Sequence, residues 1–147
     1  MSKEILRFRG HFKLTLRDKK GKFKTRREVD NLITNNGFDA ICDQISGTLG
    51  NAFNYIAIGI GTNPASASDT TLQTEAARGQ AAYEHTNGTK TFTLTYTFDA
   101  GVGTGAITES GILDAASGGT LLCRQVFTAI NKGAGDTLQV VWSFSVS

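Results

Sequence analysis

The chain has 147 residues, of which 39% are hydrophobic and 19% charged, and it contains 17 glycines but one proline. This length suits one domain with its own core, and the glycine-rich composition favours a β-rich fold. No apolar run approaches the roughly 18 residues of a membrane span. The charged, amphipathic N-terminus lacks the apolar core of a signal peptide, so we expect a protein kept in the cytosol or released by lysis.

The net charge of +2 hides an asymmetry along the chain. Residues 1–30 hold 11 basic and four acidic side chains, a balance of +7, whereas residues 31–147 hold four basic and nine acidic ones, a balance of −5. Such segregation suits head-to-tail packing between copies or docking on an acidic surface. The alternative is a solvated basic hairpin whose lysines keep the protein soluble.

The first predicted element is a strand in which apolar and polar side chains alternate from Leu6 to Leu16. Period-two alternation is typical of a half-buried strand. The expected core face carries Leu6, Phe8, Phe12, Leu14 and Leu16, and the expected outward face carries Arg7, Arg9, His11, Lys13 and Thr15. The turn signal Asp18-Lys19-Lys20-Gly21 then returns the chain as a second strand, Lys22–Leu32. Together these strands form a basic hairpin over residues 1–34.

The cations of this hairpin are the predicted partner-binding residues: Arg7, Arg9, Lys13, Arg17, Lys19, Lys20, Lys22, Arg26 and Arg27. They either protect a strand edge from aggregation or bind an acidic partner. Nucleic acid is one alternative partner, because Phe8, Phe12 and Phe23 interleave with the cations. Phe8 and Phe12 fall on the core face, however, which leaves few aromatics for stacking, so we do not expect nucleic acid as the partner.

Two short helices are predicted in the middle of the chain. Phe38–Ser46 has apolar residues at helical spacing, which Leu49 continues, and we expect this face to cover the sheet. Asp69 is a suitable N-cap for a second helix over Thr70–Arg78, with Glu75 and Arg78 paired on one face. The segment Phe53–Ile60 between them reads as a buried strand.

The rest of the chain reads as strands separated by glycine-rich turns: Thr91–Phe98, Ala106–Leu113, Leu121–Ile130 and Thr137–Val146. Regular short strands at this spacing indicate a sandwich or barrel. We therefore predict a single mostly-β domain over residues 1–147. It is an antiparallel β-sandwich or barrel-like body (35–147) with one or two short helices and the N-terminal basic β-hairpin.

The motifs of common enzymes are weak or absent in this sequence. His11 and His85 have no nucleophile or carboxylate at a motif spacing, so neither is expected to act as a general base. Gly59-Ile60-Gly61 follows a strand but lacks the lysine of a P-loop and the third glycine of a dinucleotide fold. It is better explained as a close backbone approach. We expect no enzyme, cofactor or metal.

The carboxylates lie in separate predicted elements rather than in a catalytic pair or a calcium loop. Glu109 stands mid-strand, where it can pair with Arg78 or Arg124, and Gly111 beside it would permit a bulge. Cys42 and Cys123 show no metal-ligand spacing, and each is expected to be a buried free thiol.

Several segments resemble small virion structural proteins of tailed bacteriophages, most closely head decoration (cement) proteins. They are YIAIGIGTNPASASDTTLQTEAAR, AITESGILDAASGGTLLCRQVF, GDTLQVVWSFSVS and the opening hairpin. The resemblance implies a non-enzymatic, often trimeric β-rich subunit, made in the host cytoplasm and bound on the capsid surface. Its implied partners are the major capsid protein and copies of itself. A tail-fibre, tail-tip or neck component is the alternative, and it predicts exposed aromatics on loops 51–54 and 83–87.

Overall fold

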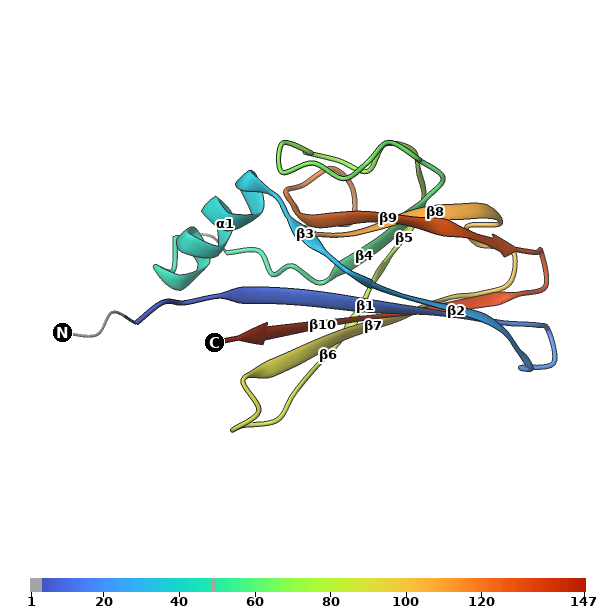
Figure 1. Ribbon diagram of the computed structural model, residues 1–147, viewed down its shortest axis with the longest axis horizontal. Coiled ribbons are helices and arrows are strands. Elements are labelled where there is room, and N and C mark those ends of the chain that lie inside the picture. Colours follow the sequence, from blue (N-terminus) through green and yellow to red (C-terminus); the bar gives the residue numbers. More distant parts are fainter. Residues whose placement is uncertain (1–3, 49) are drawn as a thin grey trace.

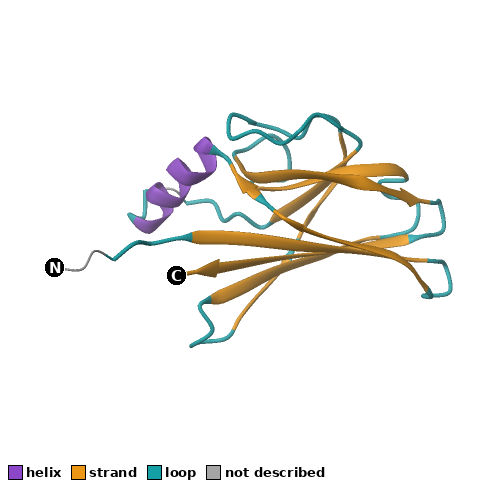
Figure 2. Cartoon of the chain, in the orientation of Figure 1, coloured by secondary structure: helices purple, strands orange, loops and turns teal. Residues whose placement is uncertain are grey.

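Two five-stranded antiparallel sheets pack face to face in the computed structural model, which describes residues 4–48 and 50–147 (Figures 1 and 2). Sheet A has the order β2 (Phe23–Asp30), β1 (Phe8–Arg17), β10 (Thr137–Val146), β7 (Thr91–Phe98), β6 (Ala82–His85). Sheet B has the order β3 (Leu32–Ile33), β9 (Leu121–Lys132), β8 (Gly105–Leu113), β4 (Tyr55–Gly59), β5 (Glu75–Gln80). The predicted mostly-β sandwich is confirmed. Two residues used in the sequence analysis lie outside the described residues: Lys3, one of the N-terminal basic residues, and Leu49, which continues the apolar face of the first predicted helix.

The basic hairpin is an integral part of sheet A. β1 lies between β2 and β10 and pairs with β10 of its own chain, with Phe12 opposite Trp142. The predicted turn is present, since Gly21 has a φ of +81° and the Asp18 carboxylate accepts the backbone N–H of Lys20 and Lys22. The second strand was expected to reach Leu32, but it ends at Asp30, and the chain then crosses to sheet B as β3.

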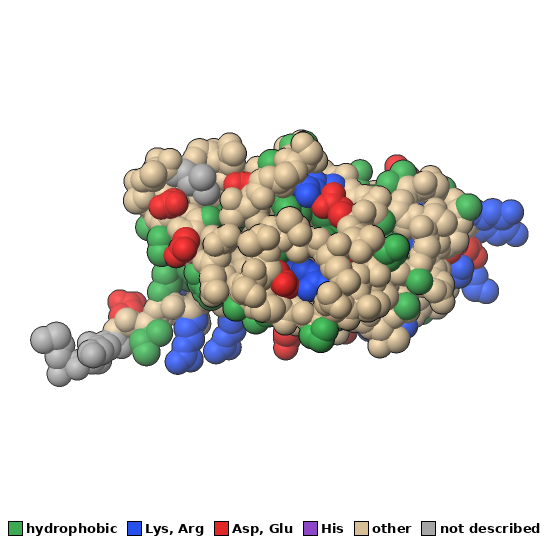
Figure 3. All heavy atoms as spheres, turned by 90° about the horizontal axis from the view of Figure 1, so that it is seen from above, with side chains coloured by type: hydrophobic (Ala, Val, Ile, Leu, Met, Phe, Trp, Pro, Cys, Tyr) green, Lys and Arg blue, Asp and Glu red, His purple; other side chains and the backbone are tan. Residues whose placement is uncertain are grey.

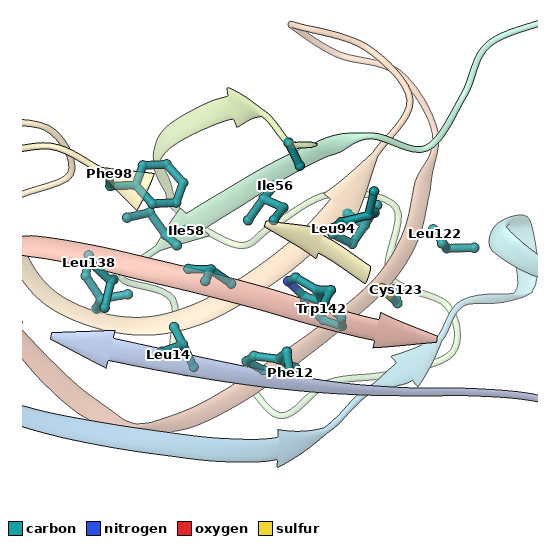
Figure 4. Close-up of a cluster of buried hydrophobic side chains, with 14 of the residues drawn as sticks. Phe12, Leu14, Ile56, Ile58, Leu94, Phe98, Leu122, Cys123, Leu138 and Trp142 are labelled. Carbon is teal, nitrogen blue, oxygen red and sulfur yellow. The ribbon is translucent and has the colours of Figure 1, made fainter. Parts of the chain in front are cut away.

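The core between the sheets is built from the inward positions of these strands (Figure 4). Phe12, Leu14 and Leu16 are buried, which confirms this part of the core face predicted for the first strand, whereas Leu6 precedes β1 and is exposed. The ring of Phe12 stacks on Trp142 with centroids 4.1 Å apart and meets Phe127 edge-on at 5.9 Å. The hairpin therefore supplies a central part of the core.

The helix α1 (Asn35–Ile45) begins three residues before its predicted start. Thr34 is its N-cap and accepts the N–H of Gly37, so Asn35-Asn36-Gly37 form the first turn of the helix. A Cβ at Gly37 would collide with the backbone of Leu122, so glycine at this position is what lets the helix approach β9 closely. The sheet-facing residues are consequently Gly37 and Ala40, with Ile41 of the predicted face packed partly buried against the core. Phe38 and Ile45, also expected to cover the sheet, stay 48% and 69% exposed.

The second predicted helix is wrong. The segment expected as Thr70–Arg78 is a loop followed by β5, and Asp69 caps nothing: its carboxylate pairs with Arg124. A two-turn helix is marginal by itself, whereas residues from Glu75 onward pair with β4, and the N–H groups of Gln73 and Thr74 bond to the Glu109 carboxylate. A bulge at Ala76 shifts the register between Ile58 and Gly59 of β4. Because of this extra residue, the side chains of Glu75 and Arg78, three positions apart, lie on the same face of β5.

The later strands lie where the sequence pattern places them. β7 and β10 have the predicted bounds, β8 begins one residue earlier, and β9 extends two residues further. β6 was not expected as a strand and pairs with the first half of β7. No bulge occurs at Gly111, which would have permitted one. β9 bulges opposite Thr108, where residues 127–129 face one residue of β8, and the register shifts again between Ile112 and Leu113.

Candidate contact surface

The outer faces of the two sheets differ in what covers them. Over sheet B lies the loop 60–74, whose Leu72 is 5% exposed and packs with Ala57, Leu113 and Leu121. Figure 1 shows this loop and the helix on the sheet B side, while the opposite side of the molecule is formed by the bare strands of sheet A. Among the described residues, the outer face of sheet A is therefore the open one.

Four of the predicted partner-binding cations lie along β1 and its N-terminal extension. Arg9, Lys13 and Arg17 occupy alternate outward positions of the strand, and Arg7 stands exposed just before it. Within the described residues none of these four forms an ion pair, so their charges are available to a partner.

The neighbouring edge strand β2 brings acids to the same face, which sequence reasoning did not weigh. The Nδ1 atom of His11 lies 3.1 Å from Asp30, and its Nε2 lies 3.8 Å from Glu28. Arg26, another predicted binding residue, stands 4.0 Å from Glu28. The β2 side of the face is thus locally neutralised, and the excess positive charge lies along β1.

The remaining lysines of the predicted set mark the tip of the hairpin. Lys19, Lys20 and Lys22 are exposed there, at the end of the molecule opposite the helix. The adjacent Lys24 holds the tip in place, because its Nζ donates to Asp136 at 2.8 Å. The bond from Lys24, together with the Gly133 N–H, lowers the pKa of Asp136.

Arg27, another predicted binding residue, makes its contacts within the molecule. Its side chain lies opposite Leu14, on the inward side of the edge strand, and donates to the carbonyls of Thr128 and Ala129. These carbonyls belong to the β9 bulge, which needs donors because its residues have no partners on β8. Period two predicts this position, since Arg27 is in phase with the half-buried Val29.

A buried ion cluster lies beneath the loop that covers sheet B. Glu109 and Arg124 are 0% and 2% exposed, and the Nε of Arg124 lies 2.8 Å from a Glu109 oxygen. This is one of the two pairings that the sequence left open. The carboxylate also accepts the backbone N–H groups of Gly61, Gln73 and Thr74, and Arg124 reaches Asp69 at 2.9 Å. The cluster therefore ties both ends of the loop to the sheet.

The electrostatics of the cluster favour the charged forms. Burial by itself raises the pKa of Glu109, but the bonds from Thr74, Arg124, Gln73 and Gly61 outweigh burial and hold it below its usual value of 4.5. Burial likewise opposes the charge of Arg124, and its two carboxylate partners nevertheless raise its pKa. With both Glu109 oxygens occupied by donors, this carboxylate acts as a structural lock rather than as an acid or base.

The glycines before the loop serve the same lock. A Cβ at Gly59 or Gly61 would lie 2.5 or 2.6 Å from a Glu109 oxygen, so only glycine lets the backbone come this close. The sequence interpretation of Gly59-Ile60-Gly61 as a close backbone approach is confirmed.

The predicted ion pair of Glu75 and Arg78 is present, at 2.6 Å. It lies on the bulged strand β5 rather than on a helix. Arg78 also donates to the carbonyls of Ala115 and Gly118, so the pair fixes the turn between β8 and β9.

The two cysteines differ, and only one matches the expectation. Cys123 is buried as predicted, and desolvation raises its pKa to about 12, whereas Cys42 is exposed on α1 because the helix buries Gly37 and Ala40 instead.

We expect a thiol reagent to modify one cysteine per native chain, at Cys42, and the second only after unfolding. Mass spectrometry of the labelled peptides checks this; modification of native Cys123 would contradict it.

A second surface, at the α1 end of the sandwich, was missed by sequence reasoning. Large apolar side chains remain exposed there: Ile5, Leu6, Phe38, Ile45 and Tyr83. The sequence placed Phe38 and Ile45 on the buried face of the helix. Their exposure follows from the helix rotation that Gly37 allows.

The fold defines a two-sheet β-sandwich with one open, partly cationic face and one apolar end. No family model, curated protein or solved structure matches the chain. Across residues 4–48 and 50–147 no cluster of His, Cys, Asp and Glu is arranged to hold a metal ion. No helix in that part of the chain is long and apolar enough to cross a membrane.

Proposed function

We propose that this chain is a non-enzymatic structural protein of a tailed-phage virion, a capsid decoration protein that binds the outside of the head and stabilises it. Its partners are the major capsid protein and copies of itself, and a trimer is the favoured assembly. The observation that supports the proposal is the set of unpaired cations, Arg9, Lys13 and Arg17, on the open face of sheet A.

The arrangement suits binding by surface complementarity. The cations project from a strand held by neighbours on both sides, so they are fixed in position before a partner arrives. An acidic capsid surface would be attracted over several ångströms and oriented by this field. The polar threonines of β7 on the same face suit close packing without exposed apolar area.

Neutralising the cationic face is expected to weaken capsid binding. The triple variant Arg9→Gln, Lys13→Gln, Arg17→Gln should lose about tenfold or more in affinity for the capsid. The three cations attract the acidic capsid surface, and water and salt screen this attraction only partly. Co-sedimentation with capsids that lack the protein, at two salt concentrations, measures the effect.

The matched control is the tip variant Lys19→Gln, Lys20→Gln, Lys22→Gln, which removes the same charge from the far end of the hairpin. A smaller loss in this control supports docking through the face. Equal losses in both triples would mean that net charge, and not this face, determines binding. Salt-sensitive binding to DNA in place of capsids would favour the nucleic-acid alternative.

The location on the virion separates the head proposal from a tail component. The tail alternative draws on Tyr83, which is 61% exposed on β6. Antibody to this chain, seen by negative-stain microscopy of purified virions, should decorate the heads. Label confined to the tail would overturn the decoration role.

A further inference from the structure

We propose that the N-terminal arm of one copy of this chain, with Ile5 and Leu6, inserts into an apolar groove at the α1 end of a second copy. The inference deepens the proposed function, in which copies of the subunit associate, and it names the contact between them. Three observations support it. The described residues leave the groove unfilled, Ile5 and Leu6 are exposed, and charges of opposite sign lie beside the arm and beside the groove.

The groove opens between the two sheets at the α1 end of the sandwich, where the helix does not close the space between them. It encloses about 400 Å³ and is lined almost wholly by apolar side chains from both sheets and the helix: Phe8, Ile33, Ile41, Ile45, Phe53, Tyr83, Phe92, Leu94, Leu122 and Phe144. Apolar cavities of roughly 150 Å³ already accept benzene. The space is therefore large enough for several aliphatic side chains.

The groove continues between α1 and the start of β1. Phe8, Ile41 and Ile45 line both parts, and the second part is also lined by Phe38, by Leu6 and by Arg7 and Arg9 of the same chain. The joined surface thus runs along the helix to the base of the arm. A patch of this kind on an isolated chain favours a protein contact.

In the described part of the arm, Ile5 and Leu6 do not fill the groove of their own chain. Ile5 and Leu6 are each 61% exposed. Arg7 exchanges both backbone hydrogen bonds with Ser147, which directs the preceding residues along the line of the strand. Figure 1 shows the described residues just before β1 continuing in the direction of that strand, past the C-terminal end of β10. The apolar pair is thus presented outward, to another molecule.

The charges beside the arm and the groove are complementary. Arg7 and Arg9 follow the apolar pair, whereas α1 carries the exposed acids Asp39 and Asp43 one helical turn apart. None of these four groups forms an ion pair inside the described chain. Figure 3 shows hydrophobic side chains between Lys or Arg beside the arm and Asp or Glu over the helix end. A second copy can match apolar groups and pair charges together.

Sedimentation of the purified chain tests the contact without any capsid. The wild-type protein should self-associate in a concentration-dependent manner. The arm variant Ile5→Asp, Leu6→Asp and the groove variant Ile45→Asp should each weaken association by about a hundredfold, because two partly exposed aliphatic side chains lose their burial or meet a charge. The control Val102→Asp changes an exposed apolar residue of the turn after β7, at the opposite end, and should associate like wild type.

Mixing the two variants distinguishes arm insertion from general stickiness. The arm variant retains the part of the groove between the sheets, which neither Ile5 nor Leu6 lines, and the groove variant retains an intact arm, so their mixture should form pairs although each alone is monomeric. Exchanging the charges makes a second test. Asp39→Arg, Asp43→Arg should weaken association about tenfold, and adding Arg7→Asp, Arg9→Asp to the same chain should restore it.

Cys42 lines the groove beside the arm and gives an independent readout. Its modification by a thiol reagent should slow as wild-type concentration rises, and should stay fast in the arm variant. Circular dichroism establishes that each variant is folded. A wild-type chain that stays monomeric at several hundred micromolar, or an arm variant that associates like wild type, would overturn the proposal. Capsid binding that fails while self-association persists would contradict only the decoration role.

Discussion

Replacing Glu109 with alanine is expected to destabilise the protein by about 3–5 kcal/mol, measured as the free energy of unfolding in urea. The change leaves the guanidinium of Arg124 buried without its closest carboxylate and frees three backbone N–H groups of the covering loop. Removing one partner of a buried pair is much more destabilising than removing the pair, because an uncompensated charge remains.

The double variant Glu109→Leu, Arg124→Leu is the matched test of this reason. It removes both charges and should recover a large part of the lost stability, although the loop N–H groups stay without their acceptor. Glu28→Gln, which changes an exposed carboxylate, should alter stability by less than about 1 kcal/mol. If Glu109→Ala behaved like Glu28→Gln, the lock would have no role in stability.

The same carboxylate makes stability depend on pH. Its folded pKa lies below 4.5, so its contribution is present in full above about pH 4.5 and is lost as pH falls through the folded value. Urea unfolding of wild type between pH 6 and pH 3 should show this decline. The decline should be smaller in the Glu109→Leu, Arg124→Leu variant, which has lost this titrating group.

Replacing Phe12 with alanine is expected to have an effect of similar size, about 3–5 kcal/mol. Phe12 is fully buried, stacks on Trp142 and contacts Phe127, so truncation leaves a cavity between the two sheets. Phe23, in the same hairpin but 54% exposed, is the matched control. Phe23→Ala should change the unfolding free energy by less than about 1 kcal/mol.

This comparison decides whether the hairpin is an appendage or part of the domain. A loss for Phe12→Ala that matched the small loss for Phe23→Ala would mean that the hairpin folds separately. The expected large difference also determines how binding should be tested. Deleting residues 1–30 would remove the interior strand β1 with its core side chains and the edge strand β2, so loss of capsid binding after deletion would report unfolding. Outward substitutions such as Lys13→Gln leave the core intact and test the surface alone.

The direction of each cationic side chain in the hairpin decides whether it is free to contact a partner or stabilises the fold. Lys13 and Arg27 belong to the same hairpin and carry the same charge, but one lies on the open face and the other donates to the carbonyls of β9. We therefore expect Arg27→Gln to reduce stability, through lost bonds to bulge carbonyls, rather than to act on binding. The face variant should show the reverse pattern.

The sequence alone determined the features that depend on neighbouring residues. Alternation, strict over Thr91–Phe98 and interrupted only at Val141 over Thr137–Val146, specified both strands to the residue, because period two is a property of each strand by itself. The hairpin turn followed from Asp18 and Gly21 in the same way. Charge segregation and the core face of β1 were equally readable from local pattern.

Tertiary structure decided everything that depends on contacts distant in sequence. Residues 70–78 carry a fair helix signal, and only pairing with β4 and the lock at Glu109 makes them loop and strand. The rotation of α1, which exposes Ile45 and Cys42, depends on how closely Leu122 approaches Gly37. Local patterns report which face is apolar, but they do not report how much of it a neighbouring element covers. The open face and the apolar groove therefore became visible only when both sheets were in place.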